Sequence, residues 1–343
     1  MSEKFQEQAL ILSQRELAPD IYSMWIQTEQ IADYARPGQF LSLYCEDGSR
    51  LLPRPISICE IDRERKALRM VYRIAGKGTE EFSQKQAGDT LRVTGPLGNG
   101  YPLGNEEAAS DMSSGNMSNS GNMLDAGNFS EDREATSERK NEKRKQRRKA
   151  FLVGGGIGIP PLLELAKQLD CEKQIILGYR DGNLYLLEDF LKLFGFNMDT
   201  EQERKENCCG SESIREADTD CKNQVSAIAE KKDTAAVNGG IYIATEDGSI
   251  GTKGNVLDAI RANALTADVI YACGPTPMLR ALKNYAQEND IECWISLEER
   301  MACGIGACLA CVCKSVEVDG HTNVRNKRIC KEGSVFDARE VEL

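Results

Sequence analysis

The chain has 343 residues, with 43 Lys and Arg against 54 Asp and Glu, and therefore a formal net charge of −11 at pH 7. This length predicts two or three domains, and the acidic balance argues against general nucleic-acid binding. Its apolar runs fall far short of the roughly 20 residues that a membrane span needs, and residues 1–7 lack the apolar segment of a signal peptide. We therefore expect a cytoplasmic protein with neither a membrane nor a nucleic-acid partner.

Residues 1–103 are expected to form an antiparallel β-barrel. Six short apolar or alternating runs are separated by turn-prone pairs such as Pro37-Gly38 and Gly88-Asp89. Runs of this length and spacing are typical of a small antiparallel barrel. The expected strands are 9–12, 21–26, 40–44, 56–61, 68–74 and 91–93.

Two motifs in this region suit a flavin nucleotide. Arg54-Pro55-Ile56-Ser57 lies at the entry of an expected strand, where an arginine fork suits a pyrophosphate and a serine hydroxyl can bond a flavin ring edge. Gly76-Lys77-Gly78-Thr79 opens an expected helix over 80–86, and a glycine-rich turn into a helix is an anion site. Either motif alone would also fit an ordinary strand or helix start.

Two polar segments interrupt the pattern. Residues 104–149 are dominated by Gly, Asn, Ser and Met and then by charges, so they cannot bury enough apolar surface to fold alone. We predict a disordered insertion, whose eight basic residues over 139–149 are a solvated part of the loop. A second polar insertion is expected at about 197–239; it contains Cys208, Cys209 and Cys221. We interpret Cys208 and Cys209 as exposed thiols, with a redox-active pair as the alternative.

Residues 150–290 alternate between strand and helix character, which predicts a parallel α/β sheet. Expected strands cover 150–153, 174–178, 241–245 and 269–272, and expected helices 160–167, 184–194, 255–263 and 277–288. Between the first strand and helix lie Gly154, Gly156 and Gly158, the context of a dinucleotide-binding turn, although Pro161 stands where a third motif glycine would be. Cys273, Gly274 and Pro275 follow the last strand, at the sheet edge where such folds bind ligands.

Residues 291–343 contain the most specific motif. Five of the 13 cysteines lie between Cys303 and Cys330, and Cys303-x4-Cys308-x2-Cys311 with a distant Cys330 is the plant-type [2Fe–2S] arrangement. Gly304 and Gly306 allow the loop to wrap closely around a cluster. A structural zinc site fits less well because it normally uses two Cys-x2-Cys pairs. Spacing alone does not exclude Cys313 as a ligand in place of Cys311.

In this order the motifs resemble the ferredoxin–NADP reductase superfamily and, within it, the electron-transfer subunits of class 1B dihydroorotate dehydrogenase. The resemblance rests on the barrel and glycine motifs, on Cys273-Gly274-Pro275, on Arg300-Met301-Ala302 before the cysteines, and on the residues after Cys330. It implies an α+β multidomain fold with a β-barrel FAD domain, an α/β nucleotide-binding domain and a small C-terminal [2Fe–2S] domain.

The resemblance also implies the cofactor contacts. FAD would be bound by nine barrel residues: Arg54, Pro55, Ile56, Ser57, Val71, Tyr72, Arg73, Gly78 and Thr79. NAD would be bound by the α/β domain at the glycine turn and at Cys273, Gly274 and Pro275. The [2Fe–2S] cluster would be held by Cys303, Cys308, Cys311 and Cys330. Arg180, after the second strand of this domain, could instead contact the 2′-phosphate of NADP.

Family members pair with an FMN-containing catalytic subunit, expected here as a heterotetramer of two subunits each. Electrons would pass from FMN through the cluster and FAD to NAD⁺ in pyrimidine synthesis. Dihydroorotate oxidation would belong to the partner, so no catalytic residue is expected in this chain, and the lone His321 is expected at the surface. The alternatives are a related NAD(P)H–ferredoxin or sulfide-linked flavin/iron–sulfur subunit and, in a different class, a zinc-bearing binding or scaffold protein.

Overall fold

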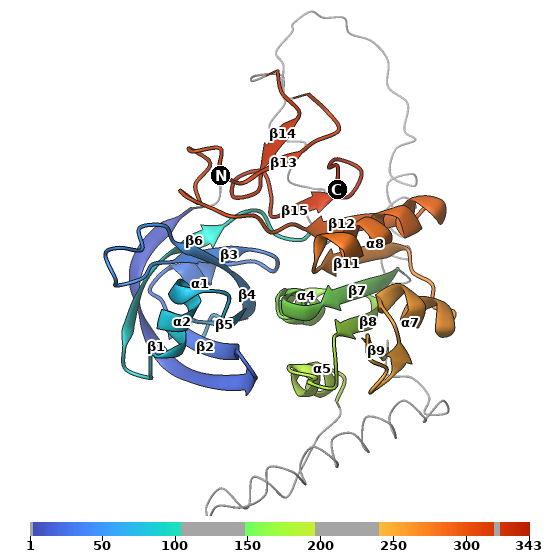
Figure 1. Cartoon of the computed structure of the whole chain (residues 1–343), viewed down its shortest axis with the longest axis horizontal. Coiled ribbons are helices and arrows are strands. Elements are labelled where there is room, and N and C mark those ends of the chain that lie inside the picture. Colours follow the sequence, from blue (N-terminus) through green and yellow to red (C-terminus); the bar gives the residue numbers. More distant parts are fainter. Residues whose placement is uncertain (1–2, 104–147, 196–239, 319–322) are drawn as a thin grey trace, which may run out of the picture.

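The computed structural model describes residues 3–103, 148–195, 240–318 and 323–343 (Figure 1). Nearly all of the expected insertions, together with Cys208, Cys209, Cys221 and His321, lie outside these ranges. An N-terminal barrel lies beside an α/β domain, and the C-terminal segment lies across the top of both in this view. None of the helices in the described ranges is long and apolar enough to cross a membrane.

The barrel is closed and antiparallel, as the sequence predicts. Its strands pair in the order β1-β2-β5-β4-β3-β6, and all six expected strands are present. They are β1 (Phe5–Ala18), β2 (Ile21–Gln27), β3 (Phe40–Leu43), β4 (Arg54–Asp62), β5 (Ala67–Arg73) and β6 (Thr90–Leu97).

Alternation along the strands fills the barrel interior with apolar side chains. Leu41 and Leu43 of β3, Ile58 of β4 and Met70 of β5 belong to one buried cluster. Two short helices, α1 (Ile31–Tyr34) and α2 (Lys77–Ser83), contribute Ile31 and Phe82 to the same cluster. The helix α2 begins three residues before the expected position, because Gly78 and Thr79 form part of its first turn.

The α/β domain contains a seven-stranded sheet in the order β10-β9-β8-β7-β11-β12-β15. The paired strands from β10 to β12 run parallel, and only β15 is antiparallel to its neighbour. The strands are β7 (Lys149–Gly155), β8 (Glu172–Tyr179), β9 (Ile241–Thr245), β10 (Thr252–Lys253), β11 (Val269–Cys273), β12 (Glu292–Ser296) and β15 (Val335–Asp337).

Helices cover both faces of this sheet. One face packs against α4 (Pro161–Gln168) and α5 (Leu187–Leu193), which lie on the side of the barrel. The other packs against α7 (Val256–Ala262) and α8 (Thr276–Glu288). The helix α5 starts three residues later than expected because Leu186, just before it, has a left-handed conformation with φ 66°.

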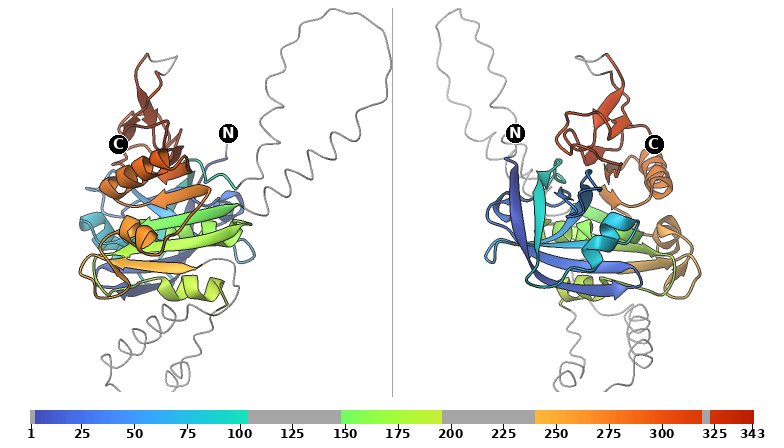
Figure 2. Two further views of the ribbon diagram at one scale, coloured as in Figure 1. Left: turned by 90° about the vertical axis from the view of Figure 1, so that its right-hand side faces the viewer. Right: turned by 60° about the vertical axis from the view of Figure 1, so that its left-hand side comes forward.

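The C-terminal segment is shared between the sheet and a separate hairpin. Although β12 and β15 fall within 291–343, the range expected for the cluster domain, both extend the α/β sheet. Between them, β13 (Val312–Lys314) and β14 (Asn326–Arg328) form an antiparallel hairpin. Figure 2 shows this hairpin projecting from the rest of the molecule in both views.

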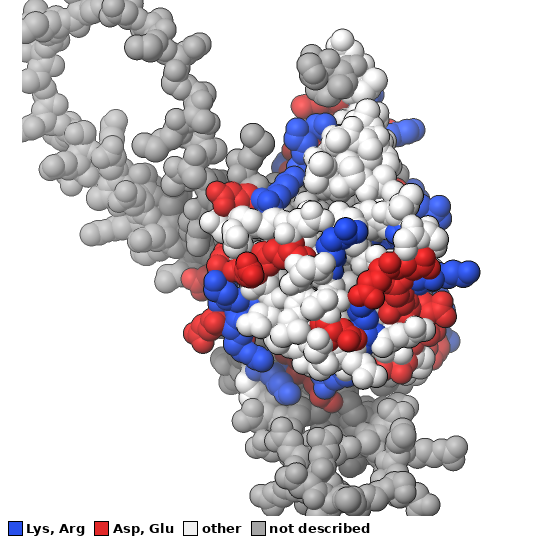
Figure 3. Space-filling model, turned by 90° about the vertical axis from the view of Figure 1, so that its left-hand side faces the viewer, with Lys and Arg blue, Asp and Glu red and all other residues white. Residues whose placement is uncertain are grey.

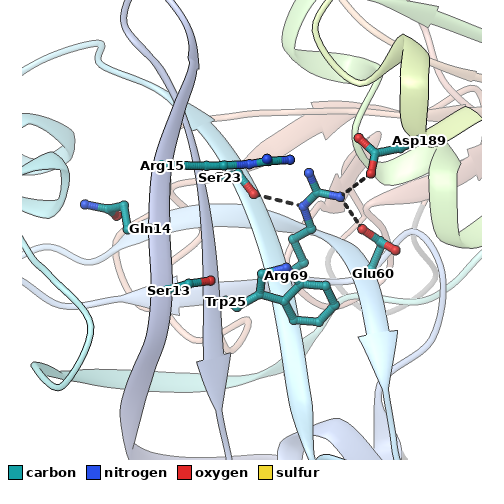
Figure 4. A pocket seen from close by; sticks show the side chains of 8 residues that line it. All are labelled: Ser13, Gln14, Arg15, Ser23, Trp25, Glu60, Arg69 and Asp189. Atoms are coloured by element: carbon teal, nitrogen blue, oxygen red, sulfur yellow. Dashed lines mark hydrogen bonds and ion pairs between the residues drawn. The ribbon is translucent and has the colours of Figure 1, made fainter. Parts of the chain in front are cut away.

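A polar network joins the outer wall of the barrel to α5 (Figure 4). Arg69 of β5, whose side chain is 4% exposed, forms an ion pair with Glu60 of β4 and one with Asp189 of α5 at 2.9 Å. Its Nε donates to Ser23 Oγ at 2.8 Å, and Lys167 of α4 also pairs with Glu60. Ser23, Glu60, Arg69 and Asp189 line a small cavity of about 420 Å³. The ion pairs of this network join the barrel to the α/β domain.

Candidate functional site

Four cysteines gather around one loop of the C-terminal segment. Cys303 and Cys308 follow β12, Cys311 directly precedes β13, and Cys330 follows β14. Cys311 and Cys330 are buried, Cys303 is half-buried and Cys308 is exposed. The group of thiols is therefore covered by protein on one side and accessible on the other.

Backbone amides of this loop point at sulfur. The N–H groups of Ile305 and Ala307 donate to Cys303 Sγ at 3.5 and 3.3 Å, and the Cys303 N–H donates to Cys308 Sγ at 3.5 Å. Burial acts to raise the pKa of the Cys303 thiol, but hydrogen bonds to its sulfur from Ile305, Cys308 and Ala307 outweigh it and lower the pKa to about 6. Amides that favour a thiolate are what a negatively charged metal cluster requires.

The four thiols associate as two pairs. Cys303 interacts with Cys308, and Cys330 interacts with Cys311 and more weakly with Cys303. Among the described residues, no three Cys, His, Asp or Glu side chains converge as ligands of a metal ion. A [2Fe–2S] cluster divides four cysteines between two irons, and two neighbouring pairs fit that requirement.

Cys313 is near Cys311 but its thiol faces the hairpin backbone. It is in β13 opposite Lys327, and its Sγ contacts the Lys327 carbonyl oxygen at 3.5 Å. Burial raises the pKa of its thiol to about 11. This placement favours Cys311 over Cys313 as the third ligand, the choice that spacing alone leaves open.

The barrel brings its two nucleotide motifs together. A Cβ added to Gly78, in the first turn of α2, would lie 2.4 Å from Arg54 Nε, so the glycine is needed for the arginine to lie there. The Thr79 hydroxyl accepts from the Ala75 N–H at 2.9 Å and donates to the Gly76 carbonyl at 3.0 Å. Arg54 and the turn over 76–79 thus form one polar site, which suits a phosphate.

The remaining expected flavin contacts lie on strands β4 and β5. Ile56 packs against the barrel core, so Pro55 and Ser57, its neighbours along the strand, face the other way. Tyr72 is 1% exposed in the barrel core and bonded to Gln14, whereas Val71 packs with the α/β domain and Arg73 is exposed. Tyr72 can therefore reach a ligand outside the barrel only through its backbone.

The glycine turn of the α/β domain packs tightly against the end of β11. A Cβ added to Gly158 would lie 2.4 Å from the carbonyl carbon and oxygen of Cys273. Gly156 has φ +54° and begins a short 3-10 turn, Gly156–Gly158, ahead of α4. The two expected nicotinamide motifs are therefore in direct contact, as a dinucleotide-binding crevice requires.

A cavity of about 600 Å³ opens at this edge of the sheet. It is lined by Gly155 and Gly156 of the glycine turn, by Pro275, and by Arg180 at the end of β8. Arg73 comes to it from the barrel. The volume is within the range of small-molecule and cofactor sites.

Comparisons with known proteins decide the family. Residues 298–342 match the model of the iron–sulfur cluster binding domain of dihydroorotate dehydrogenase B. The electron transfer subunit of dihydroorotate dehydrogenase B (NAD⁺) of Geobacillus sp. (strain WCH70) is 34% identical over 98% of this chain and 99% of its own length. That of Streptococcus thermophilus is 34% identical over 98% of both chains. The chain belongs to the family of dihydroorotate dehydrogenase B electron transfer subunits.

Solved structures support the fold of this electron transfer subunit. An NADH-dependent reduced ferredoxin–NADP oxidoreductase aligns with a TM-score of 0.63 at 24% identity, over 98% of this chain and 90% of its own. The cytochrome P450 reductase GcoB of Amycolatopsis aligns with a TM-score of 0.51 at 16% identity, over 84% of this chain and 67% of its own. At these identities the likeness concerns the fold alone.

Family membership confirms the resemblance, the oxidoreductase role and the iron–sulfur domain predicted from the sequence. As an electron transfer subunit of a dehydrogenase, the protein works with a catalytic subunit. The individual cofactor contacts stay predictions.

Two buried hydroxyl groups near these sites have no counterpart in the sequence-based predictions. Ser42 Oγ and Tyr185 Oη have no hydrogen-bond partner among the described residues. Tyr185 lines the 600 Å³ cavity, and Ser42 lies beside Gly304 of the cysteine loop. Neither belongs to a local motif, so only the packing of distant segments reveals them.

Proposed function

We propose that this chain carries electrons from dihydroorotate, oxidised on an FMN-containing partner, to NAD⁺ through its own [2Fe–2S] cluster and FAD. The observation that carries the proposal is the contact between the cysteine loop and the barrel wall. A Cβ on Gly304 would lie 2.9 Å from Ser42 Oγ and 3.4 Å from Leu97 Cδ1. Ser42 pairs directly with Pro55 of the Arg54–Ser57 motif, so the cluster and flavin sites share one strand pair.

The cluster ligands in this proposal are Cys303 and Cys308 as one pair and Cys311 and Cys330 as the other. The amides of Ile305 and Ala307 hold Cys303 as a thiolate. Burial of Cys311 and Cys330 keeps water from that side of the site. Solvent exclusion and hydrogen bonds to sulfur are the means by which a protein sets the potential of such a cluster.

In the barrel, Arg54 and the turn at Gly78 and Thr79 bind the FAD pyrophosphate. The residues around Ser57 and Val71–Arg73 lie along the ring system, with Tyr72 contributing its backbone. Bound FAD accepts single electrons and delivers a hydride to nicotinamide, which joins cluster chemistry to NAD⁺.

NAD⁺ binds in the 600 Å³ cavity, which Gly156 of the glycine turn lines. Gly154 and Gly158 allow this turn to pack against Ile159 and against the backbone of Cys273. Pro275 also lines the cavity, and Cys273 and Gly274 pack behind it against the glycine turn. Arg180 also lines this cavity, so the preference for NAD⁺ over NADP⁺ is a proposal that steady-state kinetics with both nucleotides would test.

The catalytic partner docks over the open side of the cysteine loop. Cys308 is exposed there, and Ile305 and Leu309 of the same loop are 52% and 59% exposed. On the face drawn in Figure 3, the projecting part of the molecule has an uncharged central area flanked by Lys and Arg side chains. An apolar surface beside a partly open cluster suits close contact with an electron donor.

The test is co-expression with the neighbouring dehydrogenase gene. We expect a stable complex, two subunits of each, with the visible spectrum of flavin plus [2Fe–2S] and with FMN on the partner. A chain that instead passes electrons between NAD(P)H and ferredoxin, without any dihydroorotate-oxidising partner, would support the ferredoxin-linked alternative. A colourless protein with bound zinc would exclude both redox proposals.

A further inference from the structure

Ser42 occupies an unusual position on the barrel. It lies on β3 between Leu41 and Leu43, which both point into the barrel core. Ser42 therefore points outward, on the same side as Phe40, which belongs to the same buried cluster as Cys311 and Cys330 of the cysteine segment. The outer face of β3 is thus covered by the segment that carries the cluster ligands.

The Ser42 hydroxyl is buried without a partner. The residue is 1% exposed, and its Oγ makes no hydrogen bond to any described residue. A buried hydroxyl normally bonds a protein group or an ordered ligand, because losing its bonds to water is costly. Because none of the described residues accepts a hydrogen bond from this hydroxyl, we look for an acceptor outside the polypeptide.

The cysteine segment lies directly against this hydroxyl. Gly304, directly after Cys303, lies so close that a Cβ there would be 2.9 Å from Ser42 Oγ. It also has φ +68°, a conformation that favours glycine. The loop therefore brings the Cys303 corner of the candidate cluster site onto the Ser42 hydroxyl.

We propose that Ser42 donates a hydrogen bond from the barrel to a sulfur atom at the Cys303 corner of the [2Fe–2S] cluster. Ser42 is then a positioning and tuning residue for electron transfer, and it lies directly across the strand pair from Pro55 of the flavin motif. Reduction adds negative charge to the cluster, so a donor to sulfur favours the reduced form. This inference rests on the cluster and ligands proposed above.

The test compares Ser42→Ala with the wild type in the complete two-subunit complex, by a redox titration followed by electron paramagnetic resonance. We expect the equilibrium constant for cluster reduction to fall about tenfold, which is about 59 mV for a one-electron couple. The FAD potential in the same sample should stay unchanged. Ser42→Thr, which keeps the hydroxyl, should restore most of the shift.

Ser334→Ala is the matched control. Ser334 is also a buried serine where the barrel meets the C-terminal segment, but its hydroxyl donates to the Gly38 carbonyl at 2.8 Å. Its removal should leave the cluster potential at the wild-type value. The potential is measured per cluster, so a variant with partial cluster content still gives a decisive result.

An unchanged cluster potential in Ser42→Ala, or an equal shift in Ser334→Ala, would overturn the inference. A second readout is the shift of the iron–sulfur stretching bands on transfer from H₂O to D₂O, which should be smaller in Ser42→Ala than in the wild type. Absence of a [2Fe–2S] spectrum from the wild-type complex would instead contradict the proposed function itself, so the two failures are distinguishable.

Discussion

Gly78 lies directly against the guanidinium group of Arg54, where a Cβ at position 78 would be 2.4 Å from Nε and 2.8 Å from Cζ. These residues come from separate motifs, one at the start of β4 and one in the first turn of α2. Their contact brings a cation and a helix N-terminus to one point. Adding a single methyl group at position 78 therefore tests the flavin-binding proposal.

Gly78→Ala should therefore displace Arg54 and weaken FAD binding. Loss of a charged hydrogen bond costs roughly 1.5–3 kcal/mol, which corresponds to about a tenfold to hundredfold rise in the dissociation constant for FAD. Gly48→Ala is the control, because Gly48 lies outside both motifs and a Cβ there would have no atom within 4 Å. Equal FAD affinity in both variants, measured by fluorescence titration of the deflavinated protein, would exclude the proposed role of this contact.

Tyr185→Phe tests the nicotinamide cavity. Tyr185 lines this cavity with its hydroxyl buried, and burial raises the pKa of this hydroxyl to about 12 although nearby Arg73 acts to lower it. The neutral hydroxyl is therefore available to a bound nucleotide at physiological pH. Removing one neutral hydrogen bond, worth about 1 kcal/mol, should raise the KM for NAD⁺ roughly fivefold with little change in kcat.

Tyr271→Phe provides the comparison in steady-state assays. Its hydroxyl donates to the Pro102 carbonyl at 3.1 Å, and it does not line the cavity. We expect its KM for NAD⁺ to equal that of the wild type. If Tyr185→Phe behaves in the same way as Tyr271→Phe, the nucleotide does not use the Tyr185 hydroxyl.

Much of the barrel and of the cysteine site could be predicted from the sequence because their signals are local. Alternating apolar residues define the strands from β1 to β6, and a fixed spacing defines Cys303, Cys308 and Cys311. The sequence predicts the start of α5 three residues too early, because the amino-acid composition does not indicate the left-handed conformation of Leu186.

The features that the sequence did not reveal depend on contacts between distant segments. β12 joins the α/β sheet through β11, although the cysteine motif immediately follows it along the chain. The isolated hydroxyls of Ser42 and Tyr185 become conspicuous only when other segments bury them. Local periodicity contains no information on such contacts.

The network around Arg69 predicts a large stability effect away from the cofactor sites. Arg69→Met leaves the carboxylates of Glu60 and Asp189 without their shared cation in a largely buried site. Breaking a buried ion pair by removing one partner costs about 3–5 kcal/mol, so the free energy of unfolding should fall by at least about 3 kcal/mol. Arg15→Ala, an exposed arginine at the same cavity, should cost far less in the same urea titration.

Single serine substitutions distinguish the cluster ligands. Cys311→Ser should abolish the visible spectrum of the cluster, because Cys311 belongs to the buried pair with Cys330. Cys313→Ser should retain it, because the Cys313 side chain contacts the Lys327 carbonyl group on the hairpin. Iron and acid-labile sulfide analysis of both proteins gives the answer, and the reverse pattern would assign Cys313 as the ligand.

The central claim is that electrons from dihydroorotate reach NAD⁺ only through this chain. The most direct measurement is anaerobic NADH formation by the purified two-subunit complex after addition of dihydroorotate and NAD⁺. We predict one NADH for each dihydroorotate oxidised, and none from the catalytic subunit alone. Equal NADH formation without this chain, or dihydroorotate oxidation by the intact complex without any NADH, would contradict the claim.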